Sequence, residues 1–254
     1  MKHGKVSFIG AGPGDPELLT LKGRRLIENA RLVLYAGSLV PQATVACASP
    51  NARVINSAPL TLEETHELIR ETVFSGGDVA RVHTGDPSIY GAVHEQIRLL
   101  EQDGIEYEIV PGVTAACAAA AAAKISFTLP EKRQSLVITR TEGRTCMPQK
   151  ERLRDLAAHE CALAIYLSTD RAEAMQEELE AALPPDTRVI CAHRVGWPDE
   201  NVYAATVADL AQTVRAHGDT GQTVFLVLPK ECESAPPSQL YSSAFVHACR
   251  QAKT

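Results

Sequence analysis

The chain has 254 residues, 45% of them hydrophobic and 22% charged, which is enough for one large α/β domain or two modest ones. The formal net charge of -6 argues against a general nucleic-acid-binding protein, because such proteins carry a strong basic excess. No apolar run reaches the roughly 20 residues of a membrane helix. No signal peptide precedes the first strand-like segment, so we expect a cytoplasmic protein without a membrane partner.

Seven cysteines are spread along the chain, and no two of them are spaced as Cys-x-x-Cys. An odd number without this spacing argues against a disulfide framework and against a structural zinc site. We therefore expect no metal centre, and we expect most of the cysteines to be small buried hydrophobic residues in a reducing compartment.

The first half of the chain alternates strand-like with helix-like segments. Strands are expected at residues 5–9, 31–35, 78–83 and 106–110. Helices are expected at residues 17–30, after a capping box of Thr61 and Glu64, over residues 93–100, and from Thr114 into an alanine-rich run. This alternation predicts parallel pairing in an open, doubly wound sheet, whose ligands bind at the carboxyl ends of the strands.

A Pro-Glu-Lys-Arg segment at residues 130–133 interrupts this pattern and marks the expected domain boundary. Beyond it, helical apolar stripes alternate with further strands, which are expected at residues 135–140, 162–167, 188–193, 202–206 and 223–228. We expect an α/β protein with two domains and a tail. The N-terminal domain (1–130) has a mostly parallel sheet, the C-terminal domain (131–230) has a mixed sheet, and an extension covers residues 231–254.

The loop after the first strand reads GAGPGDP at residues 10–16 and invites comparison with a dinucleotide-binding fingerprint. That fingerprint needs a third small residue, where this chain has Asp15, and a carboxylate at the end of the second strand, where it has Ala36 and Gly37. A nicotinamide site is therefore disfavoured. A rigid turn that binds no ligand remains an alternative for this loop alone.

Two further strands end in similar loops, at residues 83–88 (HTGDPS) and 111–114 (PGVT). Asp86 and Thr114 suit turns that cap the following helices, so each loop alone is equally explained by turn chemistry. Together, three such loops at successive strand ends predict a cleft walled by main chain, which suits a neutral or zwitterionic nucleoside. No Walker sequence is present, so nucleoside triphosphates are disfavoured.

These loops resemble the tetrapyrrole (corrin/porphyrin) methylase family. The resemblance rests on residues 10–15 with 18–23, on residues 85–87 and on residues 111–115, and it extends over most of residues 5–230. Within the family, four segments are similar to the members that methylate carbon 11 of a corrin precursor. They are residues 35–40, 83–91, 197–200 and 240–245.

The resemblance implies a homodimer that takes a methyl group from S-adenosylmethionine, folded between the two domains, and transfers it to a tetrapyrrole in a neighbouring trough. It implies that the donor is contacted from the first domain by Pro13, Thr84, Gly85, Asp86, Thr114 and Ala115. It implies further contacts from the second domain by Tyr166, Leu167, Val195, Gly196 and Thr223.

The sequence departs from the family in one respect. The uroporphyrinogen methylases carry an acidic residue after the tyrosine of the second strand, proposed as a base, and this chain has Ala36 there. That difference argues against the uroporphyrinogen activity and removes the obvious base. The remaining polar candidates near the cleft are Asp15, His83 and Tyr90, although His83 could equally be a structural histidine.

The implied substrate is rimmed with carboxylates and needs several cations, preferably arginines. Basic residues around the domain boundary and beside the Trp197 turn are candidates for this clamp, namely Lys132, Arg133, Arg140, Arg144 and Arg194. A solvated basic face is the alternative explanation. Trp197 is either a packing anchor or a lid over the macrocycle, and packing is the preferred interpretation.

Other functions stay open at this level. A methylase of the same fold could act on another precorrin position, on a modified histidine of a protein or on ribosomal RNA, although the acidic balance weighs against RNA. Outside this class, a nicotinamide oxidoreductase lacks its ribose carboxylate, and a non-catalytic nucleoside-binding regulator is not excluded by fold alone.

Overall fold

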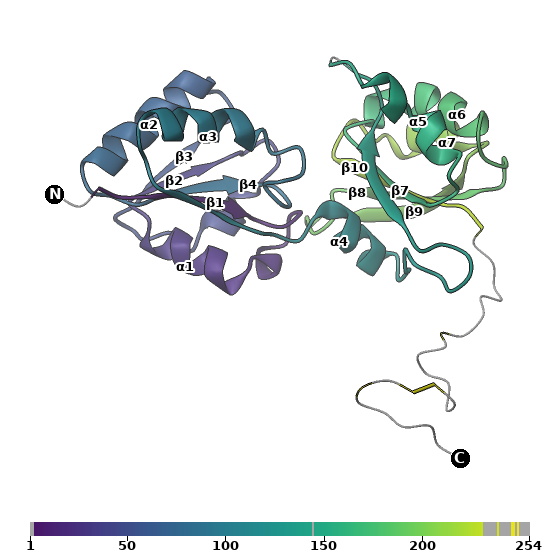
Figure 1. The fold of residues 1–254 in the computed structure, drawn as a ribbon, viewed down its shortest axis with the longest axis horizontal. Coiled ribbons are helices and arrows are strands. Elements are labelled where there is room, and N and C mark those ends of the chain that lie inside the picture. Colours follow the sequence, from purple (N-terminus) through teal and green to yellow (C-terminus); the bar gives the residue numbers. More distant parts are fainter. Residues whose placement is uncertain (1–2, 144, 231–237, 239–244, 247, 249–254) are drawn as a thin grey trace. The chain divides into compact units, whose positions relative to one another are not determined.

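The computed structural model describes residues 3–143, 145–230, 238, 245–246 and 248. They form two compact units (Figure 1): Met1–Ala119 with Arg194–Asn201, and Ala120–His193 with the residues from Val202 onward. Most of the expected extension, including the resemblance at residues 240–244, lies outside the described residues.

The first unit contains a five-stranded parallel sheet in the order β3-β2-β4-β1-β5. The strands are β1 (Val6–Gly10), β2 (Leu32–Tyr35), β3 (Arg53–Asn56), β4 (Val79–His83) and β5 (Tyr107–Val110). The predicted doubly wound parallel sheet is confirmed. The edge strand β3 was missed, because its exposed residues lack the apolar run that identifies a buried strand.

Helices cover both faces of this sheet, with α1 (Leu21–Asn29) on one face and α2 (Leu62–Phe74) and α3 (Val93–Gln102) on the other (Figure 1). The alanine-rich α4 (Ala115–Ala122) follows β5, and the division between the two units falls within it. The capping box of Thr61 and Glu64 is present at the start of α2. The single helix expected at residues 17–30 is instead two elements. A 3-10 turn at Pro16–Leu18 is followed by α1, because Thr20 is extended and caps α1 through the Gly23 N–H.

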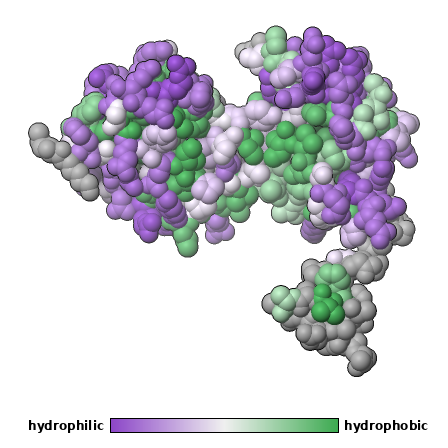
Figure 2. All heavy atoms as spheres, in the orientation of Figure 1, coloured by the Kyte–Doolittle hydropathy of each residue, from purple (hydrophilic) through white to green (hydrophobic). Residues whose placement is uncertain are grey.

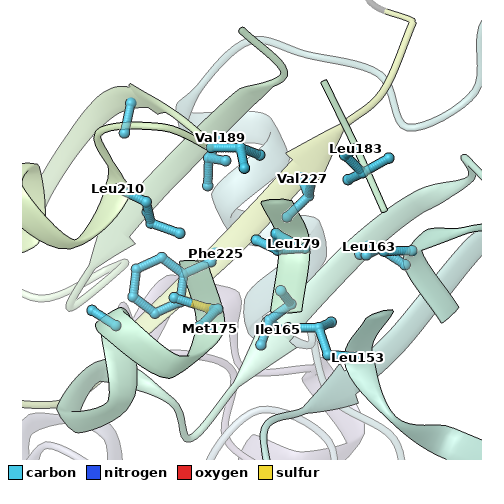
Figure 3. Packing of buried hydrophobic residues seen from close by; sticks show 14 of the residues in the cluster. Leu153, Leu163, Ile165, Met175, Leu179, Leu183, Val189, Leu210, Phe225 and Val227 are labelled. Carbon is cyan, nitrogen blue, oxygen red and sulfur yellow. The ribbon is translucent and has the colours of Figure 1, made fainter. Parts of the chain in front are cut away.

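The second unit contains a mixed sheet, as predicted. Its strands lie in the order β6-β7-β10-β8-β9. The strands are β6 (Leu136–Arg140), β7 (Ala162–Tyr166), β8 (Arg188–His193), β9 (Asn201–Thr206) and β10 (Thr223–Leu228). The helices are α5 (Leu153–Ala157), α6 (Ala172–Glu180) and α7 (Leu210–His217). Figure 3 shows the core, in which Met175 and Leu179 of α6 pack with Ile165 and Phe225 of the sheet.

Strand direction in this second sheet brings several strand ends to one edge. β6 and β7 are parallel, and β10 is antiparallel to both β7 and β8. The carboxyl ends of β6, β7 and β8 therefore lie at the same edge as the amino end of β10. In the strand register, Arg140 is paired with Tyr166, and His193 with Thr223.

The polarity of the surface differs from one helix to another. Figure 2 shows hydrophilic residues over α2 and α3 and over α5, α6 and α7, whereas the surface over the alanine-rich α4 is hydrophobic. Within the described part of the chain, no helix is both long enough and apolar enough to cross a membrane.

Burial at the core of the second unit predicts a large effect of truncating Leu179, which is completely buried. We expect Leu179→Ala to lower the free energy of unfolding by about 2–5 kcal/mol, because it removes apolar contacts and leaves a cavity. Leu21→Ala is the matched control, since Leu21 is 89% exposed, and we expect it to change stability by no more than about 0.5 kcal/mol. Urea denaturation followed by circular dichroism measures both, and equal losses would contradict the packing described.

Candidate functional site

The loops after β1 and β4 are joined by main-chain hydrogen bonds. The Gly12 N–H donates to the Gly85 carbonyl (3.2 Å), and the Gly85 N–H donates to the Gly12 carbonyl (2.7 Å). Just before this pair, the Ala11 N–H donates to the His83 carbonyl (2.8 Å). Because β1 and β4 are adjacent and parallel, both loops leave the sheet at the same edge and form a continuous main-chain surface.

The loop after β5 joins this surface through Gly112. A Cβ atom at Gly112 would lie 2.2 Å from the Gly85 carbonyl oxygen, and one at Gly10 would lie 2.5 Å from the Gly112 nitrogen. No side chain fits at either position, so the close approach of the three loops requires glycine. The predicted convergence of the segments near residues 10, 84 and 111 is therefore present in the first unit.

Asp86 fixes the relative position of two of these loops. One carboxylate oxygen accepts hydrogen bonds from the Ser88 N–H (2.8 Å) and hydroxyl (2.6 Å), and the other accepts from the Gly112 N–H (3.0 Å). Burial disfavours the charged form, but these hydrogen bonds from Ser88 and Gly112 outweigh it and hold the pKa of Asp86 below its usual value. The ionised carboxylate thus connects the β4 loop to the β5 loop.

Gly85 has a φ of +58°, which favours glycine. A Cβ atom built there would make ordinary van der Waals contacts of 3.8–3.9 Å, the nearest of them with Thr114, Val113 and the Ala115 nitrogen. This cradle brings together the predicted donor-binding residues of the β4 loop with Thr114 and Ala115. It fits a ligand group recognised by main chain, as expected for the nucleoside-like donor S-adenosylmethionine.

A fourth loop, Arg194–Asn201, packs onto the first one within the same unit. The Trp197 indole N–H donates to the Pro13 carbonyl (3.1 Å), and a Cβ atom at Gly14 would lie 2.3 Å from the indole ring. A Cβ atom at Gly196, whose φ is +78°, would lie 2.6 Å from the Asp15 nitrogen. The sequence pattern placed this loop with the second half of the chain, and the contact with the first loop was not predicted.

Arg194 is engaged inside this fourth loop. Its guanidinium lies 4.0 Å from the centre of the Trp197 ring, and its Nε donates to the Asp199 carboxylate (2.7 Å). The Gly196 N–H donates to the carboxylate of Glu200 (2.7 Å), which closes the loop. These contacts give the loop a defined shape beside Pro13.

The three residues named as catalytic candidates have different environments. Asp15 caps the 3-10 turn by accepting from the Glu17 N–H (2.8 Å). His83 is buried against Phe8, and among the described residues its Nε2 has no hydrogen-bond partner. Burial, with a smaller contribution from nearby Arg81, lowers the pKa of His83 to about 3 and keeps the ring neutral. Tyr90 is 46% exposed and has a φ of +55°.

In the second unit, Tyr166, Leu167 and Thr223 lie at the edge where β7 ends and β10 begins. Leu167 is 62% exposed and has a φ of +52°. The buried Ser168 hydroxyl holds this segment, since it donates to the Tyr166 carbonyl (2.6 Å) and accepts from the Thr141 N–H (2.9 Å). The predicted contacts Val195 and Gly196 belong instead to the fourth loop of the first unit.

The basic residues proposed to hold substrate carboxylates are placed differently from one another. Arg133 is only 2% exposed and donates to the backbone carbonyls of Pro229 (2.7 Å) and Phe127 (3.2 Å). Arg140 is half-buried and donates to carbonyls of the loop that follows β6. Lys132 is exposed, and Arg144 lies outside the described residues.

Similarity to known proteins covers almost the whole chain. The family model "Tetrapyrrole (Corrin/Porphyrin) Methylases" matches residues 5–211. A cobalt-precorrin-4 C(11)-methyltransferase of Priestia megaterium is 42% identical over 97% of this chain and 98% of its own length. A precorrin-4 C(11)-methyltransferase of Pseudomonas aeruginosa is 46% identical over 96% of this chain and 98% of its own length.

Solved structures agree with this similarity. The crystal structure of a cobalt precorrin-4 methyltransferase superposes with a TM-score of 0.86 at 44% identity, covering 88% of this chain and 94% of its own. A uroporphyrin-III C-methyl transferase from Thermus thermophilus, complexed with S-adenosyl homocysteine, gives a TM-score of 0.73 at 26% identity. That match covers 89% of this chain and 97% of the other.

The burial of Arg133 predicts a stability effect. Arg133→Ala removes the donors for the Pro229 and Phe127 carbonyls, and hydrogen bonds from charged groups contribute about 1.5–3 kcal/mol. We expect a loss of stability of that size in urea denaturation. Lys132→Ala, at the exposed neighbouring position, is the control and should leave stability unchanged. A fully stable Arg133→Ala variant with impaired substrate binding would instead favour a direct role in the clamp.

Proposed function

Since the chain belongs to the tetrapyrrole (corrin/porphyrin) methylase family, we propose that it methylates carbon 11 of precorrin-4 or cobalt-precorrin-4 in cobalamin biosynthesis. The observation that carries the proposal is the glycine floor made by Gly10, Gly85 and Gly112, where three loops approach so closely that Gly10 and Gly112 have no room for a side chain. Relatives named for the substrate with cobalt and without it are similarly close in sequence, so the proposal covers both.

S-adenosylmethionine supplies a methyl group on a sulfonium centre, with a neutral thioether as the leaving group. We assign its binding to the residues that surround the glycine floor and to those at the corresponding edge of the second sheet. They are Pro13, Thr84, Gly85, Asp86, Thr114, Ala115, Val195 and Gly196, with Tyr166, Leu167 and Thr223. The floor offers peptide groups and no cluster of basic side chains, which suits a nucleoside without phosphates.

The protein contributes chiefly by alignment. An electron-rich enamine carbon of the macrocycle must approach the methyl group in line with the methyl–sulfur bond. When both molecules are bound in this geometry, the reaction no longer depends on a chance encounter in solution. The paired loops are suited to this task because their backbone is held by mutual hydrogen bonds between Gly12 and Gly85 and by the Asp86 carboxylate. Exclusion of water strengthens polar interactions in the site.

We assign the substrate carboxylates to Lys132, Arg140, Arg144 and Arg194. Arginine binds a carboxylate through two parallel hydrogen bonds, which gives orientation as well as attraction. Arg133 supports this region indirectly, because it donates hydrogen bonds to the backbone carbonyls of Phe127 and Pro229. The proposal includes a homodimer, as the family resemblance implies, and a cytoplasmic location, as expected from the sequence.

Donor binding should depend on Asp86. Asp86→Ala removes the acceptor that orders Ser88 and Gly112, so we expect affinity for S-adenosylmethionine to fall about 10-fold or more, in line with hydrogen bonds to charged groups. Isothermal titration calorimetry measures the change. Asp186→Ala, in an exposed loop, is the control and should bind normally. Unchanged affinity of the Asp86 variant would remove this loop from the site.

The function itself is tested with the purified protein, methyl-¹³C S-adenosylmethionine, and either precorrin-4 or cobalt-precorrin-4. We expect the label to appear on carbon 11 in the ¹³C NMR spectrum of the product. Label on another ring carbon would contradict the position and keep the reaction class. The absence of any methyl transfer to a tetrapyrrole would contradict the proposed function.

A further inference from the structure

A buried polar cluster surrounds the end of β8 in the second unit. His193, the last residue of β8, lies with Nδ1 3.0 Å from the Thr223 hydroxyl. Asp219, whose side chain is 3% exposed, accepts hydrogen bonds from the Tyr203 hydroxyl (2.7 Å) and the Thr223 hydroxyl (3.0 Å). Its other oxygen lies 3.6 Å from the same Nδ1 of His193.

The hydrogen bonds around Thr223 indicate which nitrogen of His193 carries the proton. The Thr223 hydroxyl has one hydrogen, and the Asp219 carboxylate and the Gly221 carbonyl (3.4 Å) can only accept it. If the hydroxyl donates to Asp219, its oxygen is satisfied by a hydrogen bond from His193 Nδ1. We therefore assign the proton to Nδ1, which leaves the lone pair of the neutral ring on Nε2.

Tyr203 completes the orientation of Asp219. Burial, followed by the hydrogen bond to Asp219, raises the pKa of the Tyr203 phenol, so the hydroxyl keeps its proton and donates. With Tyr203 and Thr223 as donors, Asp219 is held in place and directs its second oxygen toward the ring of His193. The Thr223 hydroxyl, which lies between this carboxylate and Nδ1, connects Asp219 to the ring and fixes the ring's orientation.

The position of His193 matches the proposed site. It lies at the same sheet edge as Tyr166 and is paired in register with Thr223, both proposed donor contacts. Two residues further along the chain, Val195 and Gly196 begin the loop that packs on Asp15. The His193 side chain is 19% exposed, so part of it is accessible from outside.

We propose that His193 Nε2 is the general base of the methyl transfer, with Asp219 and Thr223 as positioning residues. The inference rests on the proposed function. The new carbon–carbon bond forms as the sulfur–methyl bond breaks, and that bond's electron pair stays on sulfur. The methylated macrocycle then carries one positive charge, which it loses as a proton from a conjugated N–H or C–H. His193 Nε2 accepts this proton and passes it to water after product release.

The candidates named from sequence are less suited to this task. The carboxylate of Asp15 caps a turn, and His83 is a weak base because burial, assisted by Arg81, lowers its pKa to about 3. Tyr90 is a phenol, which must first lose a proton of its own. His193 combines a lone pair on Nε2 with a hydroxyl and a carboxylate that orient the ring through Nδ1.

Chemical rescue tests the proposal. Single-turnover methylation of the tetrapyrrole is measured for the wild type, for His193→Ala and for the control His159→Ala, which alters an exposed histidine of the same unit. We expect His193→Ala to slow the reaction about 10²- to 10⁴-fold, the usual contribution of a general base. Donor affinity should change less than about 2-fold, and added imidazole should restore part of the rate. The control should match the wild type with and without imidazole.

A second measurement does not depend on activity. ¹⁵N NMR of the wild-type protein reports which ring nitrogen of His193 is protonated, and we expect Nδ1–H. Asp219→Asn should reduce the rate while leaving donor affinity intact, which separates orientation of the base from general damage. A protonated Nε2 in the neutral ring, or a His193→Ala variant with wild-type rate or without rescue, would overturn the assignment. A wild-type protein inactive on tetrapyrroles would instead refute the proposed function.

Discussion

The reciprocal hydrogen bonds between Gly12 and Gly85 are the constraint on which the candidate site depends. They join two loops at the ends of adjacent parallel strands, with main-chain atoms alone. Once this pair is formed, Asp86 is placed to hold Gly112, and Pro13 is placed to meet Trp197. Every further contact of the floor therefore builds on a backbone that leaves no room for side chains at Gly10 and Gly112.

His83 and His193 each end a strand, but the side chains around their rings differ. His83 ends β4 against Phe8, no carboxylate of the described residues is its partner, and burial disfavours its charged form. His193 ends β8 next to Thr223 and Asp219, which orient it through Nδ1. An aromatic ring packs against the first imidazole, whereas polar side chains hold the second, and the proposed role of His193 depends on this difference.

The sequence was informative where the physical signal is local. Apolar runs and glycine loops predicted the parallel sheet and the convergence of three loops, because strand ends of a parallel sheet share an edge. The edge strand β3 was missed since its side chains are exposed. Contacts between distant residues have no local signal: Trp197 and Pro13 are 184 positions apart. Burial of Arg133 was likewise invisible in a run of basic residues.

Each of the two units is built from two separate segments of the chain. The chain passes between the two units at residues 119–120, 193–194 and 201–202, so neither unit is one continuous stretch of sequence. A chimera that joined the first 119 residues of this protein to the remainder of another would keep Gly14 and replace the residue that packs on it. Gly14 and Trp197 fit one another in this chain, so an exchange of segments has to move both together.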